Sequence, residues 1–161
     1  MKISRAGLVV ASLLGTFVLA ACSGLTKSPA EGLTFKAPDG WTSTPGIMGI
    51  MQLWASPGTS KEVLMLFHAP SDWKSDQALD SANVKDAQIQ EQRTITICGN
   101  QSAQYLKMRA TSTRGDGDQN VQMISSKGKD GTYLALYIYP IAATPDPQAQ
   151  AAIYELCSVK P

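Results

Sequence analysis

Four strand-like segments joined by short turns are the feature that most constrains how this chain can fold. The segments are residues 94–98, 102–113, 120–127 and 132–139, and each turn between them contains glycine together with asparagine or aspartate. Since closely spaced turns of this kind connect neighbouring antiparallel strands, the series predicts an antiparallel meander.

Strands are also predicted before residue 70. Residues 33–36 form a short extended run, and residues 47–55 and 61–69 are predicted to be a hairpin that turns at residues 56–59, where the sequence is Ser-Pro-Gly-Thr. Apolar side chains occur on both faces of the second arm. That arm is therefore expected at the centre of the sheet, covered on both sides.

Two segments have helical patterns. Residues 75–90 carry spaced apolar residues among polar ones and contain no Gly or Pro, which predicts an amphipathic helix. A second helix is predicted to start at Pro147, because Asp146 is a good N-cap and proline is favoured in the first turn. Its apolar face continues to Leu156, and Cys157 is expected at the edge of that face.

The expected element order is β-β-β-α-β-β-β-β-α, which is an α+β domain with an antiparallel β-sheet covered by helices. The chain has 161 residues, of which 43% are hydrophobic, and this length suits one domain with a substantial core. The domain is expected to cover residues 33–161, because residues 22–32 are mostly small, polar or structure-breaking and are typical of a tether.

Residues 1–21 have the composition of a secretory signal peptide. Lys2 and Arg5 precede an uncharged run at residues 6–21. As a helix, this run of 16 residues would span about 24 Å, which is shorter than the ~30 Å apolar core of a bilayer. The segment is therefore expected to be removed on export rather than kept as a membrane span.

The end of this segment reads Leu19-Ala20-Ala21-Cys22 and resembles the lipobox of bacterial lipoproteins. The resemblance implies cleavage before Cys22, transfer of a lipid to its thiol, and acylation of the new amino group, for example by palmitate. Two or more acyl chains anchor a protein stably to a membrane. We therefore expect a lipoprotein that is attached through Cys22 to a membrane of the cell envelope, facing the periplasm or the exterior.

Cleavage before Cys22 leaves two further cysteines, Cys98 and Cys157. An even pair in an exported chain is expected to form a disulfide bond, because exported compartments are oxidising. The alternative is a pair of buried free thiols. A disulfide bond would pin the C-terminal helix to the strand at residues 94–98.

The stretch from Phe35 to Trp41 reads F-K-A-P-D-G-W and resembles the F-x-x-P-x-G-W start of PsbP-like domains. The predicted order of strands and helices is similar as well, so the resemblance covers about residues 33–159. It implies a PsbP-like fold and a non-catalytic accessory or binding domain, and it carries over no functional residue.

Charge and residue type exclude several classes of function. The formal net charge is +1 and becomes −1 when Lys2 and Arg5 leave with the signal peptide, so the domain lacks the basic surface that binds nucleic acid. One His and two remaining Cys do not complete a zinc site. His68 has no evident Ser or Cys partner, and no phosphate-binding or dinucleotide-binding motif is present. We therefore expect no metal, no cofactor and no enzymatic activity.

Two kinds of function fit these observations. The first is an accessory or interaction module that presents a surface to an envelope protein, and the alternative is a carrier that holds a small apolar ligand between sheet and helix. The tryptophans are the candidate binding surface, because interface energy concentrates on large aromatic residues, although the same side chains are equally suited to a core. They are Trp41, Trp54 and Trp73.

Overall fold

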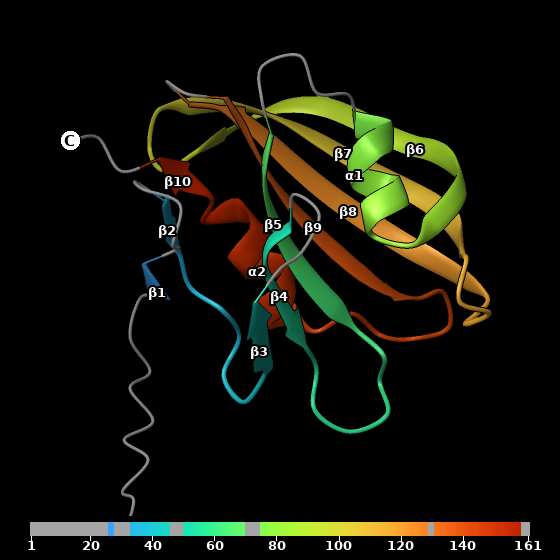
Figure 1. Cartoon of the computed structure of the whole chain (residues 1–161). Coiled ribbons are helices and arrows are strands. Elements are labelled where there is room, and N and C mark those ends of the chain that lie inside the picture. The colour runs from blue at the N-terminus through green and yellow to red at the C-terminus, as the bar shows by residue number, and fades with distance from the viewer. Residues whose placement is uncertain (1–25, 28–32, 46–49, 70–74, 129–130, 159–161) are drawn as a thin grey trace, which may run out of the picture.

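The computed structural model describes residues 26–27, 33–45, 50–69, 75–128 and 131–158 (Figure 1). Its strands are β1 (Thr26–Lys27), β2 (Leu33–Phe35), β3 (Thr42–Pro45), β4 (Ile50–Ala55), β5 (Val63–Ala69), β6 (Val84–Ile97), β7 (Gln101–Ser112), β8 (Asp118–Lys127), β9 (Thr132–Pro140) and β10 (Cys157–Ser158). The helices in these ranges are α1 (Ser75–Ser81) and α2 (Pro147–Tyr154). The described part of the chain is therefore mainly β-structure.

Seven strands form one antiparallel sheet in the order β3-β4-β5-β9-β8-β7-β6. The predicted meander is confirmed, because β6, β7, β8 and β9 follow one another both along the chain and across the sheet. The predicted hairpin is also confirmed, since β4 pairs with β5, and β5 lies inside the sheet against β9. A second sheet has the order β1-β2-β10 and brings the first and last described strands together.

The large sheet carries a hydrophobic core on each face. Along β9 the side chains alternate, so that Tyr137 lies in the core that contains α2, whereas Leu136 lies in the core that contains α1. The side chains of β5 alternate in the same way, with Leu66 toward α2 and Phe67 toward α1. The prediction that β5 is covered on both sides is therefore confirmed.

Helix α2 starts where the sequence predicts. Asp146 is the N-cap, and its carboxylate accepts hydrogen bonds from the backbone N–H groups of Gln148 and Ala149 at 2.7 and 3.3 Å. These bonds satisfy donors that the first turn of a helix leaves unpaired. Ala152 and Ile153, one turn further along, are buried against the sheet.

The C-terminal end differs from the prediction. Helix α2 ends at Tyr154, and the chain then forms β10, in which Cys157 pairs with Thr34 of β2. Cys157 therefore lies in a strand and not at the edge of the helix. Leu156, which was predicted to continue the apolar face of the helix, instead follows the helix. It is still fully buried in the core beside α2.

Helix α1 is much shorter than the helix predicted for residues 75–90. It ends at Ser81, and Asn83 then takes a left-handed backbone conformation with φ 59°, which asparagine tolerates better than most residues. From Val84 the chain forms β6, a strand of 14 residues that pairs with β7. Because β6 is the edge of the sheet and is exposed along most of its length, it lacks the alternation of a half-buried strand. The helix prediction beyond residue 81 is therefore wrong.

The predicted covering of the sheet by helices is only partly correct. Helices α1 and α2 contain 7 and 8 residues, which is too few to cover a seven-stranded sheet. Helix α1 packs against one face, and α2 packs against the other together with Phe35 of β2 (Figure 1). The described part of the chain is thus a seven-stranded antiparallel sheet with two short helices and a second, three-stranded sheet.

The F-x-x-P-x-G-W stretch forms a corner at the start of the domain, and the aromatic residues at both of its ends are buried. Phe35 stacks on Trp54 with ring centroids 5.0 Å apart, and Trp41 packs against Tyr137 at 6.4 Å. Between the two aromatic residues, Gly40 takes φ 77°, a conformation that glycine adopts without strain. The glycine turn therefore lets both aromatic side chains enter the same core.

Strand β1 lies within the segment predicted to be a tether. Thr26 pairs with Phe35, and Lys27 pairs with Thr34. Part of the predicted tether is thus joined to the domain.

Candidate functional site

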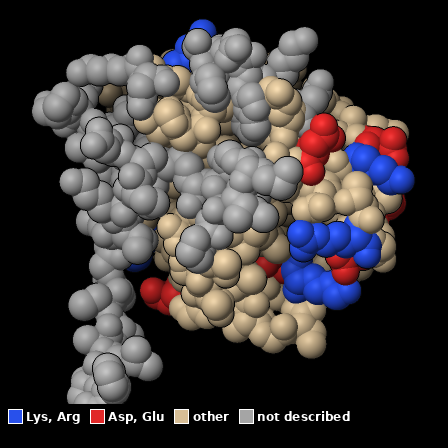
Figure 2. All heavy atoms as spheres, viewed as in Figure 1, with Lys and Arg blue, Asp and Glu red and all other residues tan. Residues whose placement is uncertain are grey.

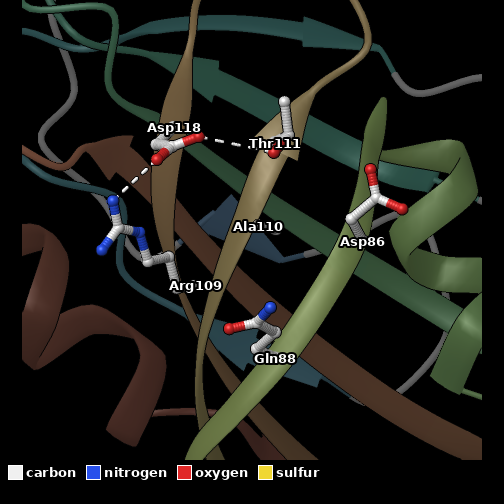
Figure 3. Close-up of a pocket in the computed structure, with 6 residues that line it drawn as sticks. All are labelled: Asp86, Gln88, Arg109, Ala110, Thr111 and Asp118. Carbon is white, nitrogen blue, oxygen red and sulfur yellow. Dashed lines mark hydrogen bonds and ion pairs between the residues drawn. The ribbon is translucent and has the colours of Figure 1, made fainter.

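A polar groove lies on β6, β7 and β8, close to the turn between β7 and β8 (Figure 3). It has a volume of about 280 Å³ and is open to solvent. Both signs of charge are present, so the groove suits a polar ligand or the polar surface of another protein. The residues that line the polar groove are Asp86, Gln88, Arg109, Ala110, Thr111 and Asp118.

Strand alternation positions the side chains from β7. Arg109 and Thr111 line the groove, whereas Met108 is buried in the core that contains α1. Asp118 begins β8 directly opposite Thr111. Its carboxylate accepts hydrogen bonds from Arg109 Nη2 at 2.7 Å and from Thr111 Oγ1 at 3.4 Å. The carboxylate therefore holds two side chains of the neighbouring strand in place.

The other side of the groove comes from β6. The pairing of β6 with β7 shifts between Lys85 and Gln88, and Asp86 takes φ 54° within this irregular stretch. A β-bulge of this kind redirects side chains at a sheet edge. In Figure 3, Asp86 and Asp118 lie on opposite sides of the strand that carries Thr111. The two acidic side chains therefore flank the groove.

Ion pairs lie in and beside the groove. Arg109 lowers the pKa of Asp118, first through its hydrogen bond and then through its charge. Asp116 lies in the neighbouring turn between β7 and β8. Its Oδ1 is 2.8 Å from Nζ of Lys61, which comes from the connection between β4 and β5, and Lys61 lowers the pKa of the Asp116 carboxyl in the same way. Because these side chains are solvated, the pairs contribute little to stability. Figure 2 shows that side chains of both signs gather on this side of the molecule, over β6, β7 and β8.

A second, smaller cleft of about 200 Å³ lies between the β2–β3 connection and α2. Lys36 and Asp39 contribute to one wall, and Gln148 and Glu155 contribute to the other. The backbone N–H of Asp39 donates to Gln148 Oε1 at 3.0 Å, so a hydrogen bond joins the two walls.

A buried polar cluster links the β4–β5 hairpin to the start of α2. This acid–tyrosine cluster consists of Glu62, Tyr137, Asp146 and Trp41. The Tyr137 hydroxyl donates to Glu62 Oε2 at 2.6 Å and accepts from the backbone N–H of Asp146 at 2.7 Å. Trp41 Nε1 donates to Asp146 Oδ2 at 3.4 Å. Hydrogen bonds therefore join the residue before β3, the β4–β5 connection, β9 and the N-cap of α2.

The acid–tyrosine cluster is enclosed. Glu62 is 6% exposed and Tyr137 is fully buried. Burial raises the pKa of Tyr137, and the hydrogen bond to Glu62 raises it further. Because its polar atoms bond to one another inside the protein, the cluster positions the hairpin and α2 and offers no open surface to a ligand.

The structure places Trp41 and Trp54 in the core. Trp41 is 9% exposed and Trp54 is 4% exposed, and both belong to the core that contains α2. The prediction that these two residues form a binding surface is therefore wrong, because large aromatic side chains fill the space between the sheet and the helix. Trp73 lies outside the described residues.

The other predicted site residues are cysteines. Cys22 lies outside the described residues. Cys98 directly follows β6 and Cys157 begins β10. Their preceding residues, Ile97 and Leu156, are both buried in the core that contains α2. The side chain of Cys157 is not among those described, and the disulfide bond stays a prediction.

His68 is not part of the polar groove or of the smaller cleft. Its ring stacks on Tyr133 with centroids 4.5 Å apart. Within the described ranges, no group of three or more His, Cys, Asp or Glu side chains could hold a metal ion. No helix in that part of the chain is long and apolar enough to cross a membrane.

The groove residues are not evident from the sequence as a site. One signal was present, because Lys107, Arg109 and Thr111 recur at every second position, which is typical of a polar strand face. Asp118 falls at the end of a predicted turn, and its contact with Arg109 depends on pairing between strands. A linear pattern does not reveal that contact.

Comparisons with known proteins give similarity in structure only. No family model matches the sequence, and no curated protein matches it. The solution structure of cyanobacterial PsbP (CyanoP) from Synechocystis sp. PCC 6803 is 16% identical, covers 77% of this chain and 87% of that chain, and has a TM-score of 0.49. A crystal structure from Bacteroides thetaiotaomicron VPI-5482 is 13% identical, covers 80% of this chain and 45% of that chain, and also has a TM-score of 0.49.

Proposed function

We propose that this chain is a lipid-anchored accessory module of the bacterial cell envelope, built on a PsbP-like domain. Two stretches of sequence support the anchor and the domain type. They are Leu19-Ala20-Ala21-Cys22, which follows a short apolar run, and the F-x-x-P-x-G-W stretch. In this proposal the module binds another envelope protein and catalyses no reaction.

The polar groove is the observation that carries the binding role. Its charged side chains are accessible, and Arg109 is held by Asp118 in a defined position. Figure 1 shows β1 and β2 on one side of the domain and the turn between β7 and β8 on the opposite side. A domain held to a membrane through β1 would therefore present the groove away from the point of attachment, where another protein can reach it.

A carrier of an apolar ligand is less well supported. Such a carrier needs an apolar cavity. Fully buried side chains, among them Tyr137 and Ile153, occupy the space between the sheet and α2. The polar groove is lined by charged and polar residues instead.

Metabolic labelling with a fatty acid tests the anchor. We expect label on the parent chain and on the Cys98→Ser control, and no label on Cys22→Ser, because only the residue that ends the lipobox accepts lipid. Equal labelling of Cys22→Ser and the parent would contradict the anchor and would leave the groove untouched.

Photo-crosslinking in the producing cell tests the binding role. A photoreactive residue at Thr111, in the groove, should form an adduct with another envelope protein. The same residue at Thr59, which is exposed in the turn between β4 and β5, is the matched control and should form none. Arg109→Glu should abolish the Thr111 adduct. Absence of an adduct at Thr111, or the same adduct at Thr59, would refute the groove as the binding surface.

A further inference from the structure

The outer edge of β6 is the longest unpaired strand edge in the described part of the domain. β6 stands at one end of the sheet, and none of the described strands pairs with its outer side. The opposite edge strand, β3, has four residues and ends at Pro45, which lacks a backbone donor. An unpaired edge offers N–H and C=O groups to another strand. β6 is therefore the edge best suited to pairing.

The two halves of β6 differ as templates for pairing. Its register with β7 shifts between Lys85 and Gln88 and again between Ile89 and Glu91. Irregularities of this kind protect an edge from further pairing. From Glu91 to Ile97 the pairing with β7 is continuous. The protection is therefore confined to the first half of the strand.

We propose that two copies of this chain pair through β6, antiparallel and about a two-fold axis at Gln92. In such a pair, residues at equal distances from the axis lie opposite one another. Glu91 of each copy then lies opposite Arg93 of the other copy. The ladder between the two large sheets forms where the regular stretches of the two copies overlap, at residues 91–93, because residues 94–97 face the irregular residues 87–90 of the other copy. This proposal depends neither on the lipid anchor nor on the partner of the polar groove.

Charge selects this register over its neighbours. An axis at Glu91 or at Arg93 would place two like charges directly opposite each other, which is destabilising in an antiparallel pair. An axis at Thr94 would place both charged side chains opposite isoleucines. The axis at Gln92 is the one among these four that pairs opposite charges.

The charged side chains are already oriented for this contact. Arg93 Nε lies 2.8 Å from Glu91 Oε1, which places both side chains on the same face of β6, and they remain 53% and 46% exposed. The Arg93 guanidinium lies 4.8 Å from the centre of the Tyr105 ring, which supports it from the neighbouring strand. A second copy would extend the ion pair to an alternating group of charges.

Disulfide trapping at the axis tests the geometry. Opposite residues of an antiparallel pair have Cα atoms about 4.5–5.5 Å apart, within the ~4.4–6.8 Å range of disulfide bonds. Purified full chain carrying Gln92→Cys should therefore form a disulfide-linked dimer under mild oxidation. Gln88→Cys, on the same exposed strand, is the matched control, because the two copies of that residue would lie about 26 Å apart at ~3.3 Å per residue. We expect trapping at least about tenfold faster for Gln92→Cys, since the axis holds its two thiols at high effective concentration.

Charge exchange gives an independent readout by sedimentation. The parent chain should be dimeric, and Arg93→Glu should be monomeric, because acidic side chains alone would then face one another. The exchange of Glu91→Arg together with Arg93→Glu restores opposite charges and should restore the dimer, which a folding defect would not do. The proposal would be overturned by equal trapping of Gln92→Cys and Gln88→Cys. It would also be overturned by a parent chain that is monomeric at every concentration, or by a double exchange that does not restore the dimer.

Discussion

Strands β9 and β6 belong to the same sheet but are built for different surroundings. Seven of the nine residues of β9 are buried, whereas in β6 only the two end residues, Val84 and Ile97, are buried. β9 lies between β5 and β8 with a core on each face, and β6 has β7 as its one neighbour in the large sheet. Place in the sheet, rather than strand formation itself, therefore decides whether a segment supplies stability or an accessible surface.

Truncation of an apolar side chain in each strand region tests this contrast most directly. Leu66 on β5 is fully buried, and Ile89 on β6 is 59% exposed. Leu66→Ala should lower the free energy of unfolding by about 2–5 kcal/mol because it leaves a cavity. Ile89→Ala should change it by less than about 0.5 kcal/mol. Urea unfolding followed by tryptophan fluorescence measures both, and similar losses would show that the two regions do not differ in this way.

The expected disulfide bond would tie the end of β6 to β10, and its removal should have the next largest effect. Cys98→Ser should lower the free energy of unfolding by up to about 4 kcal/mol, since the bond closes a long loop. Cys157→Ser and the double variant should each lose the same amount, because either substitution removes the whole bond. Dithiothreitol should destabilise the parent and leave the variants unchanged. Additive losses, or a parent that is insensitive to reduction, would rule out the bond.

The acid–tyrosine cluster tests how polar atoms are accommodated in the buried region around β9. Tyr137→Phe should cost about 1–3 kcal/mol, since it leaves the buried Glu62 carboxylate without that hydrogen bond. Combining it with Glu62→Gln forms a double-mutant cycle. Urea unfolding of the four proteins should give a clear coupling energy. Strictly additive effects would mean that the two side chains do not act together.

Alkaline pH should weaken the region in which tyrosines are buried. Burial raises the pKa of Tyr105 to about 12, whereas a tyrosine in an unfolded chain titrates near ~10. The folded chain therefore holds this proton more tightly, so the stability it contributes is complete below about pH 10 and is lost as the pH rises toward about 12. The free energy of unfolding, measured from pH 9 upward, should fall less steeply in Tyr105→Phe than in the parent. Identical slopes would contradict this assignment.

The smallest effects are expected at the exposed ion pairs. Arg109 and Lys61 lower the pKa of Asp118 and Asp116 respectively. Each carboxylate therefore contributes its small stabilisation above the unfolded pKa of ~3.9, and the contribution is lost as the pH falls through the lowered value. In an NMR titration, Arg109→Gln should raise the pKa of Asp118 and leave that of Asp116 in place. Lys61→Gln should do the reverse, and a common shift of both carboxyls would argue against separate pairs.

The regions also differ in how well the sequence predicts them. The strands from β7 to β9 were predictable, because glycine-containing turns separate segments of strand length. Helix α2 was predictable from Asp146 and Pro147, since a capping signal is local. Residues 84–90 were misassigned to a helix, because an exposed edge strand shows no hydrophobic period and its pairing partner, β7, lies later in the sequence.

Site residues were harder to predict than elements. Tryptophan is common in binding surfaces, but Trp41 and Trp54 both pack into the core between the sheet and α2. The groove contact between Arg109 and Asp118 arises only when β7 and β8 pair. Residue type alone therefore identifies side chains that are able to bind a partner, whereas the pairing of strands decides which of these side chains are accessible.

The small sheet at the start of the domain gives the proposed anchor a mechanical property. A pull on the tether would reach β1 first, and β1 is held to β2 by two residue pairs. Such a short ladder peels open under little force, whereas Phe35 at the end of β2 is locked in the core. Each residue that peels away adds up to ~3.3–3.6 Å of reach. In the proposed lipoprotein, the first strand would thus act as spare length that lets the domain reach a more distant partner while its main sheet stays folded.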